Sequence, residues 1–288
     1  MQVAQLVVFG IGTGAFLLIA TLGFALIRRV EGFLNIAHAE LMSVAAFTTW
    51  YLNAGLGWHF VLAASIGVAV TAVVSLLVAR LVYDPIKHLG PAILLISSVG
   101  VAFVLHGITE AFIGVGIRSF EIPRLSALSM GGVLVAPYRF ALLGLAAVTS
   151  IGLALFLTKT RTGKFIRAMS INRVLAASRG VDIKAASRAT WLVTGVLAGL
   201  GGVALGVLGT LTTDIAFEQI LVILAVAIVA GLGSLYGVIL AAFIVGLAMD
   251  LSLLILPGGY RPVIAFAIVI LVLLIRPQGV AGNLERTA

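Results

Sequence analysis

The sequence contains no cysteine and few charged residues. The lack of cysteine excludes disulfides, iron–sulfur clusters and metal sites built on thiolates. Only 10% of the 288 residues are charged, whereas a soluble domain usually carries about 25%. The apolar share is 62% and the mean hydropathy is +1.25. Because a water-soluble fold of this length cannot hide so much apolar surface, we expect an integral membrane protein.

Long runs without charge predict several membrane crossings, since a helix needs about 20 apolar residues to cross the hydrocarbon core. Two runs are too long for one crossing, and the later one is expected to break at a turn containing Gly231, Gly233 and Gly237. The predicted fold is all-α: a polytopic integral membrane helix bundle with about eight or nine membrane segments, some short or broken. The nine expected segments are 5–27, 38–53, 60–80, 91–113, 139–158, 188–212, 216–231, 238–256 and 261–276.

The distribution of Lys and Arg predicts the orientation, because cytoplasmic loops carry an excess of both. Residues 159–188 contain eight basic residues and one acid, which places this stretch in the cytoplasm. The N-terminus then lies outside and the C-terminus inside, with 14 of the 18 basic residues on the inner side. Residues 114–138 form the long external connection. Residues 1–288 are therefore predicted to be a single transmembrane domain.

The sequence lacks the motifs that catalysis would need. A phosphate-binding loop requires the pattern GxxxxGK[ST], but Gly163-Lys164 is followed by Phe165 and lacks the first glycine. The four histidines have no metal-ligand spacing. We therefore expect a non-enzyme that binds no metal or cofactor itself and has no nucleic-acid partner.

Within the basic stretch, the sequence predicts a short helix over 171–179. Ser170 is expected to cap its start, and Gly180 to end it in a left-handed conformation. Asp182 is expected to cap the next helix, which leads into the following membrane segment. The two predicted helices and the glycine between them form an elbow, and two interpretations of it stay open. It is either a surface that docks another subunit, or a solvated loop that fixes the topology and touches lipid phosphates.

Several motifs of the chain resemble those of permease subunits of branched-chain amino-acid ABC importers. They are NIAHAE at 35–40, GVD at 180–182, LAGLGG at 197–202, AGLGS at 230–234 and RPQG at 276–279. These motifs occur in the same order as in the family and extend over residues 33–279, which is nearly the whole chain.

The resemblance implies several partners in and beside the lipid bilayer. These are a second homologous permease subunit, two cytoplasmic ATPase subunits that hold ATP and Mg, and an extracytoplasmic amino-acid-binding protein. The resemblance also implies that the helix of the basic stretch is a coupling helix held in an ATPase groove. The implied coupling residues are Ile171, Asn172, Arg173, Val174, Leu175, Arg179 and Gly180.

Ionisable groups inside the apolar segments are candidate pathway residues, because such groups are costly in a bilayer unless they face protein or water. His106 and Glu110 lie four residues apart and are expected to form a pair, either lining the pathway or tying two helices together. Asp250 lies within an apolar segment, and Arg261 is its expected structural partner. The full set of candidates is Asn35, His38, Glu40, His106, Thr109, Glu110 and Asp250.

Three of these candidates belong to the NIAHAE motif. Asn35, His38 and Glu40 are expected to open the second segment beside Arg28 and Arg29. Residue type alone predicts anchors at the membrane interface, whereas the resemblance implies a gating or pathway-support role.

The predicted function is that of a permease subunit in a bacterial inner (plasma) membrane. It would form half of the translocation pathway for branched-chain amino acids, driven by ATP hydrolysis on partner subunits. One alternative is the same type of importer for urea or short amides. Another is a stand-alone channel or secondary transporter, which would need charged coupling residues near the middle of the bilayer and no docking loop.

Overall fold

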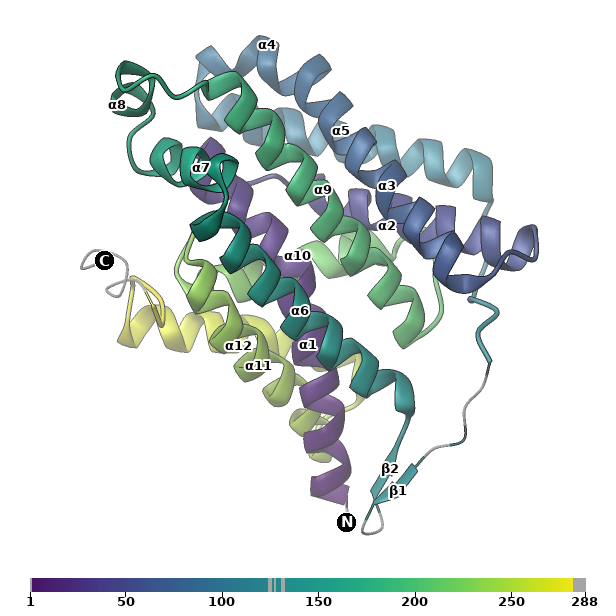
Figure 1. The fold of residues 1–288 in the computed structure, drawn as a ribbon. Helices are drawn as coiled ribbons and strands as arrows, with labels where there is room; N and C mark the ends of the chain where they lie inside the picture. The colour runs from purple at the N-terminus through teal and green to yellow at the C-terminus, as the bar shows by residue number, and fades with distance from the viewer. Residues whose placement is uncertain (1, 124–125, 127, 131–132, 282–288) are drawn as a thin grey trace.

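A computed structural model describes residues 2–123, 126, 128–130 and 133–281, and these residues form a helix bundle (Figure 1). The α-helices are α1 (Gln2–Glu31), α2 (His38–Trp50), α3 (Phe60–Val78), α4 (Asp84–Ile86), α5 (Pro91–Ile113), α6 (Pro137–Lys159), α7 (Arg161–Ile171), α8 (Arg173–Ser178), α9 (Ile183–Leu208), α10 (Ile215–Ala230), α11 (Leu235–Leu251) and α12 (Arg261–Ile275). The strands are β1 (Leu128–Met130) and β2 (Val133–Val135).

In the described part of the chain, seven helical stretches are long and apolar enough to cross a membrane. They begin with α1, α3, α5, α6, α9, α11 and the short turn before α12. Each of the nine predicted segments has a helix at its place, but α10 has 16 residues and α2 has 13. A π-helical turn, Tyr51–Gly55, extends α2. The membrane helix bundle is therefore confirmed, whereas the count of eight or nine crossings is confirmed only in part.

The helix α1 runs through the bundle and packs against α11 and α9 (Figure 1). Its contact with α11 requires small residues, since a Cβ added to Gly246 would lie 2.5 Å from the backbone nitrogen of Gly14. Helix α9 meets α2 in the same way, because a Cβ on Gly202 would lie 2.0 Å from the carbonyl oxygen of Met42. Such small residues let membrane helices approach closely.

Residues 32–37 return into the bundle after α1 instead of staying at its end. Phe33, Asn35 and Ala37 are all buried. His38 donates a hydrogen bond from Nε2 to the carbonyl of Ala20, at 2.9 Å. Ala20 precedes the end of α1 by eleven residues, which is roughly 16 Å along the axis. Helix α2 therefore begins deep inside the bundle.

The two ends of the bundle differ in structure. The helices α4, α7 and α8 lie at one end, here called the α8 end, and the N-terminus and the β1–β2 hairpin lie at the other, here called the hairpin end (Figure 1). The hairpin belongs to residues 114–138, where no strand was predicted. This connection is tied to the bundle, because the backbone nitrogen of Glu121 donates to Asn53 Oδ1 at 2.8 Å.

The outer helices expose wide apolar faces. In the membrane-length stretch that contains α12, only 11% of the residues are buried inside the chain, and the corresponding stretches of α3 and α6 reach 28%. The central helices α1 and α9 reach 67%. The exposed faces are therefore suited to contact lipid or another apolar membrane subunit.

Candidate translocation and coupling sites

A buried carboxylate on α2 is the centre of the first candidate site. Glu40 Oε1 lies 3.4 Å from His106 Nδ1 on α5, and His106 Nε2 lies 3.9 Å from Asp214 Oδ1, just before α10. The Phe217 ring of α10 packs edge-on against the imidazole, with centroids 5.0 Å apart. Three helices thus bring together an acid, a histidine and a second acid.

Exposure increases stepwise along this series. The side chain of Glu40 is 3% exposed, that of His106 is 16% and that of Asp214 is 81%. The series therefore leads from the surface into the bundle. His106 lies seven residues before the end of α5, or roughly 10 Å along its axis, so the entrance faces the hairpin end.

The buried groups of α2 have hydrogen-bonding capacity left over. Within the described residues, both carboxylate oxygens of Glu40 and the hydroxyls of Ser43 and Thr49 lack a hydrogen-bond partner. The Thr21 hydroxyl of α1 and the Thr194 hydroxyl of α9 share this condition. Buried polar groups usually have partners, so this part of the bundle is suited to a polar ligand or to water.

Asn35 and His38 hold residues 32–37 in place inside the bundle. The Tyr83 hydroxyl donates to Asn35 Oδ1 at 3.0 Å, and His38 binds the carbonyl of Ala20. The backbone nitrogen of Ile36 donates to the Ser98 hydroxyl at 3.0 Å. The NIAHAE residues therefore lie deeper than the interfacial position expected beside Arg28 and Arg29, because the segment is pinned to α1 and α5.

The expected pair of His106 and Glu110 is not what the described residues show. His106 faces Glu40, while Glu110 is exposed on the surface of α5 and Thr109 is buried. The spacing of four residues does place both side chains toward one side of α5. Glu40 of α2 nevertheless takes the place of Glu110 as the partner of His106, because only His106 lies at the contact with α2.

Asp250 has the partner that the sequence predicts. Arg261 Nη2 donates to Asp250 Oδ1 at 2.6 Å, and the Thr13 hydroxyl donates to Asp250 Oδ2. Arg261 also reaches the Thr13 oxygen at 3.3 Å. This network joins α1, α11 and the start of α12 through Asp250.

The turn between α10 and α11 follows the predicted break. Gly231 and Gly233 both have φ of +92°, and the Ser234 hydroxyl accepts a hydrogen bond from the nitrogen of Gly237 at 3.0 Å. A Cβ on Gly237 would lie 2.3 Å from the carbonyl oxygen of Ala230, which explains why this position is a glycine.

The residues after α12 complete this turn. The nitrogen of Val280 donates to the carbonyl of Val229 at 2.8 Å, and that of Ala281 donates to Ala230 at 3.3 Å. Gly279 packs directly on the backbone of Gly231. The AGLGS and RPQG motifs are thus two halves of one structural unit.

Two helices, α7 and α8, lie in residues 159–182, where the sequence predicted one short helix over 171–179. Helix α7 ends at Ile171, and Asn172 Oδ1 accepts a hydrogen bond from the nitrogen of Leu175 at 3.0 Å. Asn172 therefore caps α8, and the prediction that Ser170 caps a helix over 171–179 is wrong. Ser170 donates to the carbonyl of Arg167 instead, because it lies within the last turn of α7.

The end of the elbow agrees with the sequence prediction. Gly180 has φ of +81°, which is the left-handed conformation expected after a helix. Asp182 Oδ1 accepts a hydrogen bond from the nitrogen of Ala185 at 2.9 Å and so caps α9.

The end of α7 and helix α8 present apolar side chains to their surroundings. Ile171 is 79% exposed, Val174 81% and Leu175 54%, whereas Ala176 is buried. Arg173 Nη1 lies 3.3 Å from Glu31 Oε2 at the end of α1, and the Ser187 hydroxyl donates to the other oxygen of Glu31. Arg179 is exposed. The elbow is therefore an exposed apolar knob that Glu31 attaches to the bundle.

Sequence reasoning missed the role of Glu31 and the approach of Asp214 to His106. Glu31 is an acid directly after Arg28 and Arg29, within the inner basic group, and this unusual placement is a signal for a partner. The contact of Asp214 with His106 has no local signal, because the two residues are 108 positions apart.

Comparison with known proteins identifies the family. Residues 6–274 match the family described as the branched-chain amino acid transport system permease component. The chain belongs to this family. It is 24% identical to the high-affinity branched-chain amino acid transport system permease protein LivH of Escherichia coli (strain K12), over 96% of this chain and 94% of LivH. It is 26% identical to the corresponding protein BraD of Pseudomonas aeruginosa, over 98% of this chain and 96% of BraD.

Membership of this family agrees with the resemblance found in the motifs. With its apolar helices, this permease is a multi-pass protein of the cell inner membrane. It is a transport subunit, as its relatives are by name.

Proposed function

We propose that this permease forms half of the translocation pathway of an ATP-driven importer for branched-chain amino acids. The observation that carries the proposal is helix α8, because a capped helix with exposed Val174 and Leu175 outside the bundle is suited to contact a protein partner. The family membership supports ATPase subunits as that partner and a second permease on the outer apolar faces.

In this proposal the Lys- and Arg-rich α8 end faces the cytoplasm and the hairpin end faces outward. Closure of the ATPases moves α8, and the contact of Arg173 with Glu31 transmits this movement to α1. Since residues 32–37 join α1 directly to α2, the Glu40 region moves with it. An extracytoplasmic binding protein supplies the amino acid at the hairpin end.

The same arrangement supports the proposed cargo. A branched-chain amino acid carries an ammonium group that can donate hydrogen bonds to the unpartnered oxygens of Glu40, and an apolar side chain that suits the walls of the bundle. Urea, the cargo of the alternative, carries neither the charge nor the apolar side chain. The family description also favours branched-chain amino acids over urea.

The experiment is reconstitution of this permease with its partner permease, two ATPases and the binding protein in proteoliposomes. Leucine uptake is expected to require internal ATP, with urea transported far more slowly. Uptake by this chain without ATPases would contradict the proposal and favour a secondary transporter, for which Glu40 at mid-depth would be the coupling residue.

The proposed orientation has its own test. The chain has no cysteine, so Ser170→Cys and Ala54→Cys each introduce a single thiol. An impermeant maleimide is expected to label Ala54→Cys from outside and Ser170→Cys only in inverted vesicles. Labelling of both thiols from the same side would contradict the orientation.

A further inference from the structure

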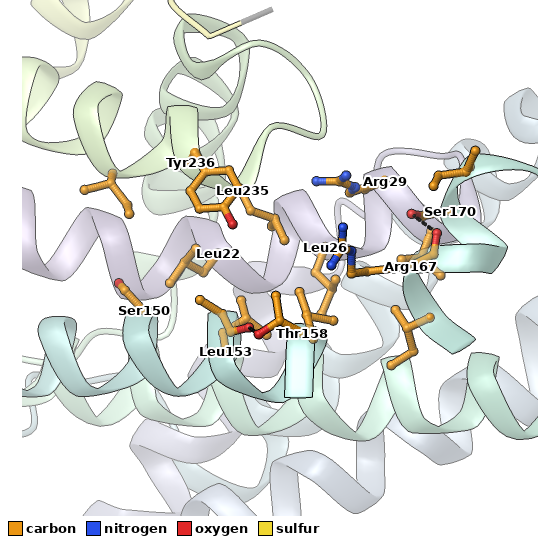
Figure 2. A pocket seen from close by; sticks show the side chains of 16 residues that line it. Leu22, Leu26, Arg29, Ser150, Leu153, Thr158, Arg167, Ser170, Leu235 and Tyr236 are labelled. Carbon is orange, nitrogen blue, oxygen red and sulfur yellow. Dashed lines mark hydrogen bonds between the residues drawn. The ribbon is translucent and has the colours of Figure 1, made fainter. Parts of the chain in front are cut away.

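A cavity of about 220 Å³ lies between α1, α6, α7 and α11, near the α8 end (Figure 2). Most of its lining is aliphatic. Apolar cavities of about 150 Å³ accept a benzene molecule, so this one has room for several methylene groups. The apolar walls include Leu22, Leu26, Leu153, Leu157, Leu235 and Ile239.

The two guanidinium groups of the cavity lie at one end, whereas Ser150 and Tyr236 lie further along it. Figure 2 shows Arg29, Arg167 and Ser170 together, with Leu22 and Leu153 further along the cavity. Arg29 comes from the last turns of α1 and Arg167 from α7, so two separate helices bring guanidinium groups to the same mouth.

This arrangement matches the chemistry of an amphiphilic anion. Guanidinium groups bind phosphate through pairs of parallel hydrogen bonds, and aliphatic walls favour a hydrocarbon chain. Basic pockets between membrane helices on the cytoplasmic side bind anionic lipid headgroups. The orientation given under the proposed function places this mouth at the inner leaflet, and the inference rests on that orientation.

We propose that the cavity binds an anionic phospholipid of the inner leaflet, with its phosphate between Arg29 and Arg167 and an acyl chain along the leucines of α1 and α6. Ser170 supplies a hydroxyl beside the phosphate. Because α7 ends at the residue before the α8 cap, the bound lipid joins the coupling segment to α1 and α6.

The test uses the assembled transporter in detergent, titrated with phosphatidylglycerol or with phosphatidylcholine of the same acyl chains and measured by native mass spectrometry. The wild-type complex is expected to bind phosphatidylglycerol at least fivefold more tightly. Arg167→Gln is expected to remove this preference. The matched control is Arg161→Gln, an exposed arginine at the start of the same helix that does not line the cavity and should leave the preference unchanged.

A second variant tests the apolar part. Ala154→Phe places a ring in the cavity and is expected to weaken phosphatidylglycerol binding at least fivefold, which keeps the proposal testable if Arg167→Gln does not assemble. Glycerol phosphate, which has no acyl chain, is expected not to compete; competition at equal concentration would assign the site to free phosphate compounds.

Equal binding of the two lipids by the wild type, or an unchanged preference in Arg167→Gln, would overturn the lipid site. Leucine uptake by the same complexes after reconstitution into proteoliposomes distinguishes this outcome from failure of the proposed function. A transporter that takes up leucine without any lipid preference contradicts only the lipid site.

Discussion

Helix α2 buries polar side chains, whereas helix α8 exposes apolar ones. Helix α2 buries Glu40, Ser43 and Thr49 among other helices, whereas α8 exposes Val174 and Leu175 at the end of the bundle. Buried polar groups without partners and apolar groups exposed to water both cost free energy. Other molecules are therefore expected at both places. Cargo or water would satisfy the buried polar groups of α2, and a protein would cover the exposed apolar groups of α8.

The largest expected effect comes from making α8 polar. Truncating or charging a central apolar anchor of an interface costs about 2 kcal/mol or more, and each 1.4 kcal/mol is tenfold in affinity. Leu175→Asp is therefore expected to weaken association with the ATPases about thirtyfold, measured by co-purification from membranes. Thr162→Asp adds the same charge on α7 and should have little effect. If Leu175→Asp keeps full leucine uptake and full association with the ATPases, α8 does not dock an ATPase and serves only to fix the topology.

The second prediction removes the buried carboxyl group of α2. Glu40→Gln keeps the size of the side chain but removes the ionisable group that faces His106. Leucine uptake is expected to fall at least tenfold, with expression and assembly near the wild-type level.

The matched control for Glu40 is Glu110→Gln, which removes a charge from the exposed surface of α5. It is expected to change uptake less than twofold. Loss of the folded protein in Glu40→Gln would show that the carboxylate serves the fold, since breaking a buried pair costs about 3–5 kcal/mol.

A smaller effect is expected at the end of the elbow. Gly180 has a left-handed backbone, which costs a residue with a side chain about 1–2 kcal/mol. Gly180→Val is expected to reorient α8 and to raise the ATP hydrolysed per leucine transported about fivefold. Gly180→Asn is the control, because asparagine tolerates this conformation. Equal coupling in both variants would show that the backbone at residue 180 does not set the position of α8.

The smallest effect concerns the ion pair that attaches α8 to α1. Partly exposed ion pairs contribute about 1 kcal/mol or less, so Arg173→Gln is expected to weaken ATPase association less than threefold. The double variant Arg173→Gln/Glu31→Gln should be no weaker than Glu31→Gln alone, because each single change already breaks the contact. Additive losses would show that the two residues act separately.

The parts of the structure that could be predicted from the sequence depend on local chemistry. Gly231 and Gly233 mark the turn after α10 because few other residues adopt their backbone conformation. Asp182 caps α9 through a residue three positions away. The Asp250–Arg261 pair was also predictable, since a short turn brings the two together.

The parts that could not be predicted depend on contacts between distant residues. Hydropathy reports how apolar a segment is but not how deep it lies, so the return of residues 32–37 into the bundle has no signal in composition. His106 has a local candidate partner in Glu110, yet the approach of α2 decides in favour of Glu40. Ser170 and Asn172 are both good helix caps, and only the continuation of α7 through Ile171 selects Asn172.

The attachment of Val280 and Ala281 to the end of α10 has a consequence for the order of events during synthesis. The carbonyls of Val229 and Ala230 receive these hydrogen bonds from residues made about fifty positions later. At translation rates of about 5–20 residues per second, this interval lasts several seconds. Both remaining membrane helices emerge in that time, so α10 acquires its last hydrogen bonds only when the whole bundle is already present.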